Sequence, residues 1–165
     1  IGRLVAKRLA GFECRLLGYD PVIAAQRAEE IGVSLVNLET LFKDSDFVTL
    51  HVPFTEETAN LVNESLLMRM KGGATLINCA RHGIIDEEAL RRIKPMKRLR
   101  FLNDVYAKDE PGPKSCADLA DIMLPHLGAS THEANWNAAR RAAAQLLEFD
   151  EKGIASSVVT CSCTR

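Results

Sequence analysis

Apolar and polar residues alternate along the chain at two spacings, one typical of helices and the other of buried strands. Apolar residues recur at helical spacing from Ile1 to Leu9, and Gly11 follows, which predicts a helix at the start of the chain. Runs that are apolar throughout, such as ATLINCA at 74–80, predict strands that are covered on both faces. The expected strands are residues 14–20, 33–36, 46–53, 74–80, 99–105 and 121–126.

Helices are expected in the segments between these strands. Asn37, Asn63 and Asp86 each precede a helical pattern, and such side chains accept hydrogen bonds from the free N–H groups of a first turn. Ser130 with Glu133 fits a capping box in front of a long helix over about 131–148. Strands and helices that alternate in this way predict an α/β fold, a doubly wound parallel sheet with helices on both faces.

Composition and charge exclude several function classes. The 165 residues are 47% apolar and 26% charged, with a net charge of -1, so neither nucleic acid nor a membrane surface is an expected partner. No apolar run has the roughly 20 residues that cross a bilayer. Scattered cysteines favour reduced thiols and a cytoplasmic location. Cys161 and Cys163 are interpreted as part of a C-terminal tail rather than as a metal or redox pair, and no metal site is predicted.

One segment departs from this even charge balance. Residues 91–100, RRIKPMKRLR, hold six basic side chains in ten. Such a cluster can mark contact with nucleic acid. Because the segment joins an expected helix to an expected strand in a chain of near-zero net charge, we interpret it as a solvated helix end.

Ionisable residues stand at the ends of five expected strands. Ligands of open α/β sheets bind beyond the carboxyl ends of the strands, so these side chains would share one edge of the sheet. Charge scattered over a surface would rarely produce such a pattern. The five residues are Asp20, His51, Arg81, Asp104 and His126.

Asp20 and Gly2 indicate a dinucleotide. Gly2 opens a helix and lies 18 positions before Asp20. Dinucleotide-binding folds carry a glycine-rich turn, and about 20 residues later an acid accepts hydrogen bonds from the ribose hydroxyls. Gly2 would be the last glycine of that turn, with the first strand and the other glycines before residue 1. An acid at this position would repel a 2′-phosphate, which favours NAD over NADP.

Arg81, Glu110 and His126 form a second constellation. A guanidinium grips a carboxylate with two hydrogen bonds, an imidazole exchanges a proton with a hydroxyl near neutral pH, and a carboxylate orients that imidazole. Oxidation of a 2-hydroxy acid requires these groups. Two structural alternatives stay open: a surface ion pair between Arg81 and Glu110, and a core histidine at position 126 with satisfied hydrogen bonds.

Five motifs, in order along the chain, resemble one family. Up to about Val159 the chain is similar to the D-isomer-specific 2-hydroxyacid dehydrogenases, and most of all to their D-3-phosphoglycerate dehydrogenase branch. The motifs are GYDP (18–21), SDFVTLHVPFTEET (45–58), MKGGATLINCARHGIIDEEAL (70–90), DVYAKDEP (104–111) and PHLGASTHEAN (125–135). The resemblance implies a Rossmann-type domain over 1–159 that is truncated at its N-terminus, a tail over 160–165, and a substrate-binding domain outside this chain.

The resemblance also implies a role for each matched residue. Arg81 would bind the substrate carboxylate, His126 would be the general acid/base, and Glu110 would pair with it. Asp20 would hold the adenosine ribose, and Asp104 the nicotinamide carboxamide. The pyrophosphate turn and the walls of the NAD cleft would be formed by Ile1, Gly2, Val52, Cys79, Ala80, Leu127, Gly128 and Ala129, together with Arg81 and His126.

The chain departs from the family pattern in three places. His82 stands where the family has glycine after the strand-tip arginine. KRLRFLN (97–103) replaces a stretch that is usually rich in glycine and alanine, and DVYAKDEP is one residue longer than the usual form. Because His82 adds a bulky, titratable ring beside Arg81, this departure bears on substrate identity.

Three functions are compatible with these residues. The first is NAD-dependent oxidation of a D-2-hydroxy acid, with 3-phosphoglycerate, converted to 3-phosphohydroxypyruvate in serine synthesis, as the expected substrate. The second is an NAD-sensing transcriptional corepressor, because such proteins resemble this scaffold and keep the dehydrogenase residues. The third is an inactive fragment of a cofactor domain. A homodimer through the cofactor domain is also implied by the resemblance, and the alanine-rich helix with Trp136 is compatible with it.

Overall fold

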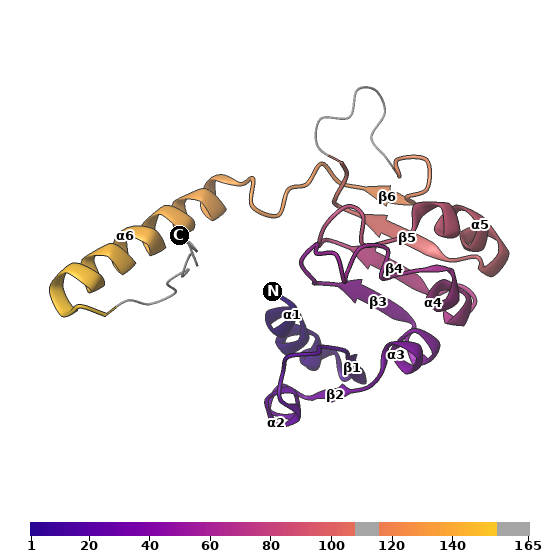
Figure 1. Cartoon of the computed structure of the whole chain (residues 1–165), viewed down its shortest axis with the longest axis horizontal. Helices are drawn as coiled ribbons and strands as arrows, with labels where there is room; N and C mark the ends of the chain where they lie inside the picture. The colour runs from indigo at the N-terminus through magenta and orange to yellow at the C-terminus, as the bar shows by residue number, and fades with distance from the viewer. Residues whose placement is uncertain (108–115, 155–165) are drawn as a thin grey trace, which may run out of the picture. The chain divides into compact units, whose positions relative to one another are not determined.

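The computed structural model of the chain describes residues 1–107 and 116–154, in which helices and strands alternate (Figure 1). The helices are α1 (Gly2–Leu9), α2 (Ala25–Glu29), α3 (Leu38–Asp44), α4 (Glu64–Arg69), α5 (Glu87–Lys97) and α6 (His132–Lys152), with a 3-10 turn, η1 (Ala10–Phe12), after α1. The strands are β1 (Leu16–Gly18), β2 (Val33–Leu35), β3 (Phe47–Leu50), β4 (Thr75–Asn78), β5 (Arg100–Asn103) and β6 (Ile122–Met123). Every predicted strand is present, and each is shorter than its apolar run.

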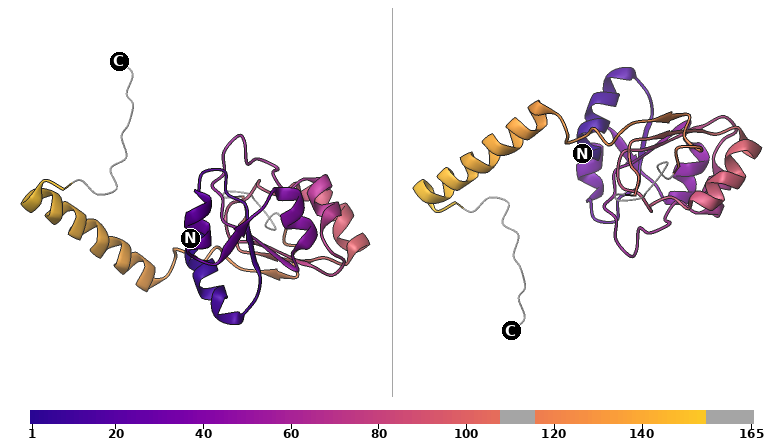
Figure 2. Two further views of the ribbon diagram at one scale, coloured as in Figure 1. Left: turned by 90° about the horizontal axis from the view of Figure 1, so that it is seen from below. Right: turned by 90° about the horizontal axis from the view of Figure 1, so that it is seen from above.

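The strands form two parallel sheets. One pairs β1 with β2, and the other has the order β3-β4-β5-β6. Helix α1 and the α4–α5 pair lie on opposite sides of the four-stranded sheet (Figure 2). The predicted parallel strands with helices on both faces are therefore present, but the single continuous sheet is not, because no strand of the described residues is hydrogen-bonded to both β1 and β3.

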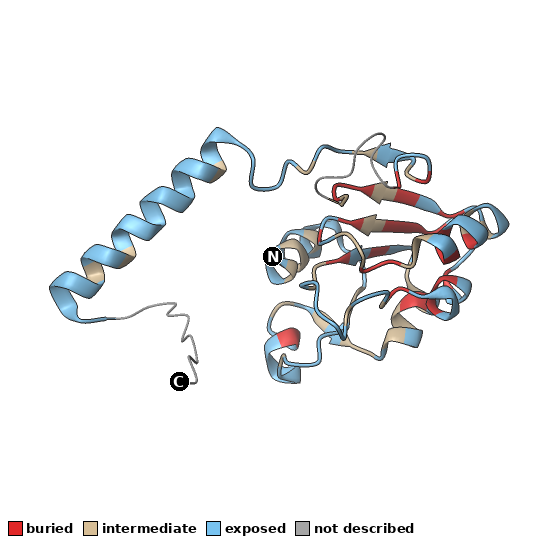
Figure 3. Ribbon diagram, turned by 45° about the horizontal axis from the view of Figure 1, so that its top comes forward, coloured by how far each residue is buried: buried red, intermediate tan, exposed pale blue. Residues whose placement is uncertain are grey.

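The hydrophobic core lies between the four-stranded sheet and helices α3 to α5 (Figure 3). Burial of large apolar side chains is the main stabilising term in such a layer. The largest fully buried side chains are Phe42, Val62, Leu67, Met70, Ile84, Leu76, Leu90, Phe101 and Val105. Among residues 1–41, all of which are described, Ala28 is the only buried apolar residue.

Side-chain caps define where the helices begin. Asn37 accepts from Thr40 N at 2.8 Å, Asn63 from Leu66 N at 3.1 Å, and Asp86 from Ala89 N at 2.9 Å, as predicted. The prediction of Ser130 as the cap of the last helix is wrong. Thr131 Oγ1 accepts from Ala134 N at 3.0 Å, while the Ser130 amide is used in a turn to Leu127 O.

The basic segment 91–100 lies largely inside α5, which continues through Pro95 to Lys97. Three of its cations pair with carboxylates from other segments: Arg92 with Glu64 at 2.7 Å, Lys94 with Asp121 at 3.0 Å, and Arg91 with Asp118. These partly exposed pairs add little stability each. They neutralise much of the cluster, in agreement with its interpretation as a helix surface.

The chain divides into two compact units, Ile1–His126 and Leu127–Arg165. The described part of the second unit is a turn over 127–131 followed by the 21-residue helix α6, which ends at Gly153 in the left-handed conformation (φ 65°). None of the residues of α6 is buried. In the part of the chain that the structure describes, no helix combines the length and the apolar character needed to cross a membrane.

Candidate active site

Four of the five predicted strand-tip residues lie at one edge of the four-stranded sheet. His51 and Asp104 directly follow β3 and β5, whereas Arg81 and His126 lie in the turns beyond β4 and β6. Because these strands are parallel, their carboxyl ends point to the same edge. Asp20 follows β1 in the smaller sheet.

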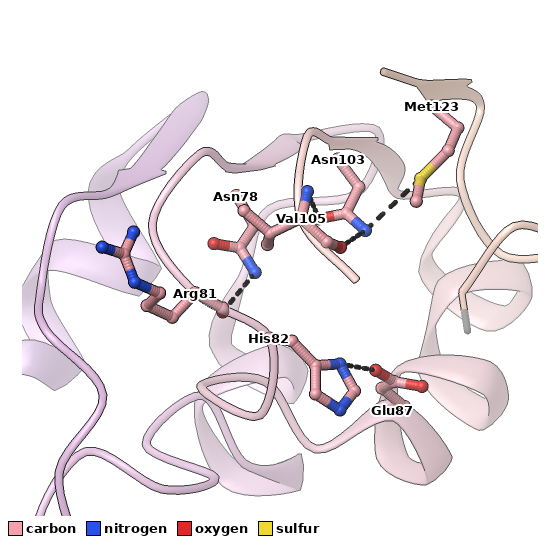
Figure 4. A network of polar contacts seen from close by, with 7 residues as sticks. All are labelled: Asn78, Arg81, His82, Glu87, Asn103, Val105 and Met123. Atoms are coloured by element: carbon pink, nitrogen blue, oxygen red, sulfur yellow. Dashed lines mark hydrogen bonds and ion pairs between the residues drawn. The ribbon is translucent and has the colours of Figure 1, made fainter. Parts of the chain in front are cut away.

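Two asparagines that the sequence analysis missed build this edge. Asn78 and Asn103 end β4 and β5, face each other in register, and are both 3% exposed. Asn78 accepts from Ala80 N at 3.0 Å and donates to Arg81 O at 3.1 Å, while Asn103 donates to Val105 O at 2.6 Å (Figure 4). Each side chain thus folds the backbone over the end of its own strand. The available signal was the repeat of an apolar strand closed by asparagine, TLIN and RFLN.

Arg81 lies in the turn that Asn78 holds. Its Nη1 donates to Ala80 O at 2.6 Å, and its side chain is exposed. Two residues later Gly83 adopts φ 82°, and a Cβ at that position would lie 2.8 Å from Phe54 Cε2. Only glycine meets both conditions without strain. The backbone after Arg81 is therefore fixed by a close approach to the 53–58 segment.

His82, the departure from the family pattern, points away from Arg81 (Figure 4). Its Nδ1 lies 3.2 Å from Oε1 of Glu87 in the first turn of α5, an ion pair when the imidazole is protonated. Burial, and next a hydrogen bond with the same Glu87 carboxylate, raise the pKa of the Cys116 thiol. Glu87 therefore contacts both His82 and the buried Cys116.

Asp104 is a buried carboxylate, 7% exposed, at the carboxyl end of β5. Its amide donates to Asn78 O at 2.9 Å, which joins the ends of β4 and β5. Desolvation, and next the Asp104 charge, raise the pKa of the Cys79 thiol at the neighbouring strand end. Ala80 is buried beside them. These residues form a compact wall at the middle of the edge.

His126 is the general acid/base candidate. It adopts φ 59°, and its ring meets the Tyr106 ring edge to face, with 6.3 Å between centroids and 79° between planes. Glu110, the predicted partner of His126, lies outside the described residues. The predicted cofactor contacts Leu127, Gly128 and Ala129 belong to the exposed turn of the second unit.

Gly2 and His51 are in close contact. A Cβ on Gly2 would lie 3.4 Å from His51 Cβ, so the start of α1 packs tightly on the residue that follows β3. Thr49 Oγ1 lies 3.1 Å from His51 Nε2. Burial lowers the pKa of the His51 imidazole. Ile1 is exposed, and Val52 is half-buried.

Asp20 lies two residues beyond β1, at the start of a bend over 21–23. Its Oδ1 accepts from Val22 N at 2.9 Å and Ile23 N at 3.1 Å, which fixes an exposed carboxylate beyond the strand. A helix that starts at a closely packed glycine, with an acid after the next strand, fits a dinucleotide: the helix start suits the pyrophosphate and the acid suits the ribose.

Comparison with known proteins identifies the family. Residues 1–134 match the profile described as D-isomer specific 2-hydroxyacid dehydrogenase, NAD binding domain. The chain belongs to this family. NAD is accordingly its cofactor, as predicted, and the residues at the sheet edge fit it.

Individual relatives agree with the family match. The chain is similar to D-3-phosphoglycerate dehydrogenase of Synechocystis sp., with 45% identity over 88% of this chain and 27% of that protein. In structure it is similar to D-2-hydroxyisocaproate dehydrogenase, with TM-score 0.82 and 30% identity over 98% of this chain and 53% of that one. It is also similar to Aquifex aeolicus D-lactate dehydrogenase complexed with NAD and lactic acid, with TM-score 0.74 and 28% identity over 93% of this chain and 51% of that one.

These likenesses confirm the Rossmann-type α/β fold. The chain spans about a quarter of the length of the curated relative and about half of the solved chains.

Proposed function

We propose that the whole protein is an NAD-dependent dehydrogenase of D-2-hydroxy acids, and that 3-phosphoglycerate is its substrate. The observation that carries the proposal is the turn beyond β4, which presents an exposed Arg81 at the same sheet edge as Asp104 and His126. The similarity to a D-3-phosphoglycerate dehydrogenase supports the choice of substrate.

Each group has a defined task in this proposal. NAD supplies the hydride acceptor for the C2 hydrogen of the hydroxy acid. Arg81 binds the substrate carboxylate through two N–H groups and so orients C2. His126 accepts the hydroxyl proton, and Glu110 orients the imidazole. Asp104 holds the nicotinamide carboxamide, and the remaining predicted contacts line the cofactor cleft.

The proposal includes the organisation of the whole protein. In residues 1–107 and 116–154, β1 and β3 each have one edge without a hydrogen-bonded strand. These edges support one further strand between them, which would carry the other glycines of the pyrophosphate turn. A homodimer through the cofactor domain is supported by the exposed apolar side chains of α6, among them Trp136 and Leu146. The cysteines are odd in number and scattered along the chain, which supports reduced thiols and a cytoplasmic location.

Two substitutions in the whole protein test the catalytic assignment. Arg81→Ala and His126→Ala should each lower kcat/KM for 3-phosphoglycerate at least about a hundredfold, because the first removes the group that orients C2 and the second removes the proton acceptor. Arg100→Ala and His132→Ala are the matched controls, since both side chains are exposed and lie outside the proposed site. Near-normal turnover in both site variants would overturn the assignment. Turnover that is slow with every hydroxy acid would favour an NAD-sensing binding protein.

A further inference from the structure

The turn that carries Arg81 is fastened at both ends by side chains. Before Arg81, Asn78 Oδ1 accepts from Ala80 N at 3.0 Å, and Asn78 Nδ2 donates to the Arg81 carbonyl at 3.1 Å. After Arg81, His82 Nδ1 lies 3.2 Å from Glu87 Oε1 (Figure 4). Arg81, which we assign to the substrate carboxylate, thus lies between two residues whose side chains are held in place, Asn78 and His82.

Glu87 is a firm anchor for this contact. It is the first residue of α5, and Ala89 and Leu90 in the same turn are fully buried against the core. Its carboxylate is about one quarter exposed (26%) and is also hydrogen-bonded with the buried Cys116 thiol. Because Glu87 stands on a helix whose first turn packs into the core, and its side chain is less exposed than that of His82 (26% against 38%), His82 is the partner that is restrained.

His82 can affect Arg81 only through the backbone. The two side chains leave the turn in opposite directions, so the imidazole does not reach the groups that the guanidinium would bind (Figure 4). The backbone that follows is closed as well: Gly83 O accepts from Asn60 N at 2.9 Å, and Ile84 is fully buried. His82 is therefore the half-exposed residue that joins Arg81 to the packed backbone at Gly83 and Ile84.

We infer that His82 is a positioning residue for Arg81, acting through its contact with Glu87. The inference rests on the proposed function, in which Arg81 binds the substrate carboxylate. The contact limits rotation of the backbone on the carboxyl side of Arg81, as the hydrogen bond from Ala80 N to Asn78 limits it on the amino side. Loss of the contact leaves the guanidinium present but less well directed, so substrate binding weakens while the chemical groups remain.

His82→Ala in the whole protein tests this inference. We expect KM for 3-phosphoglycerate to rise about fivefold with kcat and the NAD dissociation constant nearly unchanged, because uniform binding of the carboxylate is reduced. Glu87→Gln should have a similar effect. His82→Asn should recover most of the loss, because the Asn amide places a donor close to the position of Nδ1. Glu88→Gln, at the neighbouring exposed carboxylate, is the matched control and should leave KM unchanged.

The double variant His82→Ala/Glu87→Gln decides the mechanism. If His82 acts through Glu87, the double variant should match His82→Ala alone; additive losses would show independent effects and overturn the inference. An unchanged KM in His82→Ala, with thermal stability preserved, would overturn it as well. Arg81→Ala is measured beside these variants. Near-normal kcat/KM in Arg81→Ala would overturn the proposed function itself, whereas a strong Arg81→Ala effect with no His82→Ala effect would remove only the positioning role.

Discussion

Residues 1–37 and residues 38–105 follow the same strand–helix pattern but differ sharply in burial. The first region forms β1, β2, α1 and α2, and Ala28 is its only buried apolar residue. The second forms β3 to β5 with α3 to α5 and contains nearly the whole hydrophobic core. The contrast is visible between Leu17 in β1, which is half-buried, and Leu76 in β4, which is fully buried. Sequence pattern thus specifies the element, while its neighbours decide how much of it is buried.

The number of neighbouring strands explains the difference. β4 has a hydrogen-bonded strand on each side, whereas among the described residues β1 pairs with β2 alone. A two-stranded sheet covers little apolar surface and is marginal on its own. In this chain the proposed cofactor site therefore combines a well-packed half, with Arg81 and Asp104, and a sparsely packed half, with Gly2 and Asp20.

A core truncation in each region gives the largest expected contrast. Phe101→Ala in β5 should lower the free energy of unfolding by about 3–5 kcal/mol, because the ring is 1% exposed and leaves a cavity. Leu17→Ala in β1 should cost under about 1 kcal/mol in this chain, since much of its side chain already contacts water. Denaturant unfolding of this chain measures both. Equal losses would show that the two regions are equally packed and would contradict the comparison.

Gly83 and Gly32 have similar φ angles but differ in how closely other atoms approach them. Gly83→Ala should lower the free energy of unfolding by about 2–3 kcal/mol. The backbone at this position has φ 82°, which is strained for alanine, and the new Cβ would lie 2.8 Å from Phe54 Cε2. Gly32→Ala, at φ 72° with nothing within 4 Å, should cost only the backbone strain of about 1 kcal/mol. Thermal unfolding of the two variants tests the difference. A larger loss at Gly32 would contradict the tight packing of the Arg81 turn.

The sparsely packed half should still contribute to cofactor binding. Asp20→Ala should weaken NAD binding about tenfold, because hydrogen bonds from the ribose hydroxyls to a charged acceptor are lost. It should also reduce the ratio of NAD affinity to NADP affinity, because the carboxylate that would repel a 2′-phosphate is gone. Calorimetric titration of the whole protein measures both affinities, with Asp46→Ala, an exposed acid paired with Lys71, as the control. Unchanged NAD affinity would place the ribose elsewhere.

Two helix caps extend the comparison to α6 and give the smallest expected effect. Asn63→Ala should lower global stability by about 1 kcal/mol, because α4 is packed into the core. Thr131→Ala removes a cap of the same geometry from a helix with no buried residue. Its effect on global unfolding of this chain should be close to zero, with a loss of helical circular dichroism only. A global loss in Thr131→Ala equal to that in Asn63→Ala would show that α6 folds cooperatively with the core.

Much of the fold follows from local sequence signals. The strand positions, the caps at Asn37, Asn63 and Asp86, and the parallel α/β arrangement depend on contacts within a few residues or on alternation of element types. The division into two sheets does not follow from local signals, because it depends on which strands are hydrogen-bonded neighbours. The choice of Thr131 over Ser130 likewise depends on the residue at which the turn over 127–130 ends and α6 begins, which local sequence does not specify.

The common sheet edge could be predicted, but the hydrogen bonds that shape it could not. Strand-tip charges predicted that Arg81, Asp104 and His126 lie at one edge, and their positions at the strand ends agree. The asparagines that shape the strand ends were missed, because a buried amide resembles any other polar strand end in sequence. The pairing of His82 with Glu87 was missed because it requires the turn at Gly83 and the start of α5 to face each other.

The central claim is that the whole protein oxidises a D-2-hydroxy acid with NAD. The most direct measurement is NADH formation over a panel of hydroxy acids, each tested as D and L enantiomers with NAD and with NADP. We predict turnover of D-3-phosphoglycerate with NAD, with little from its L enantiomer and less with NADP. NADH formation with no member of the panel, although NAD binds, would contradict the account.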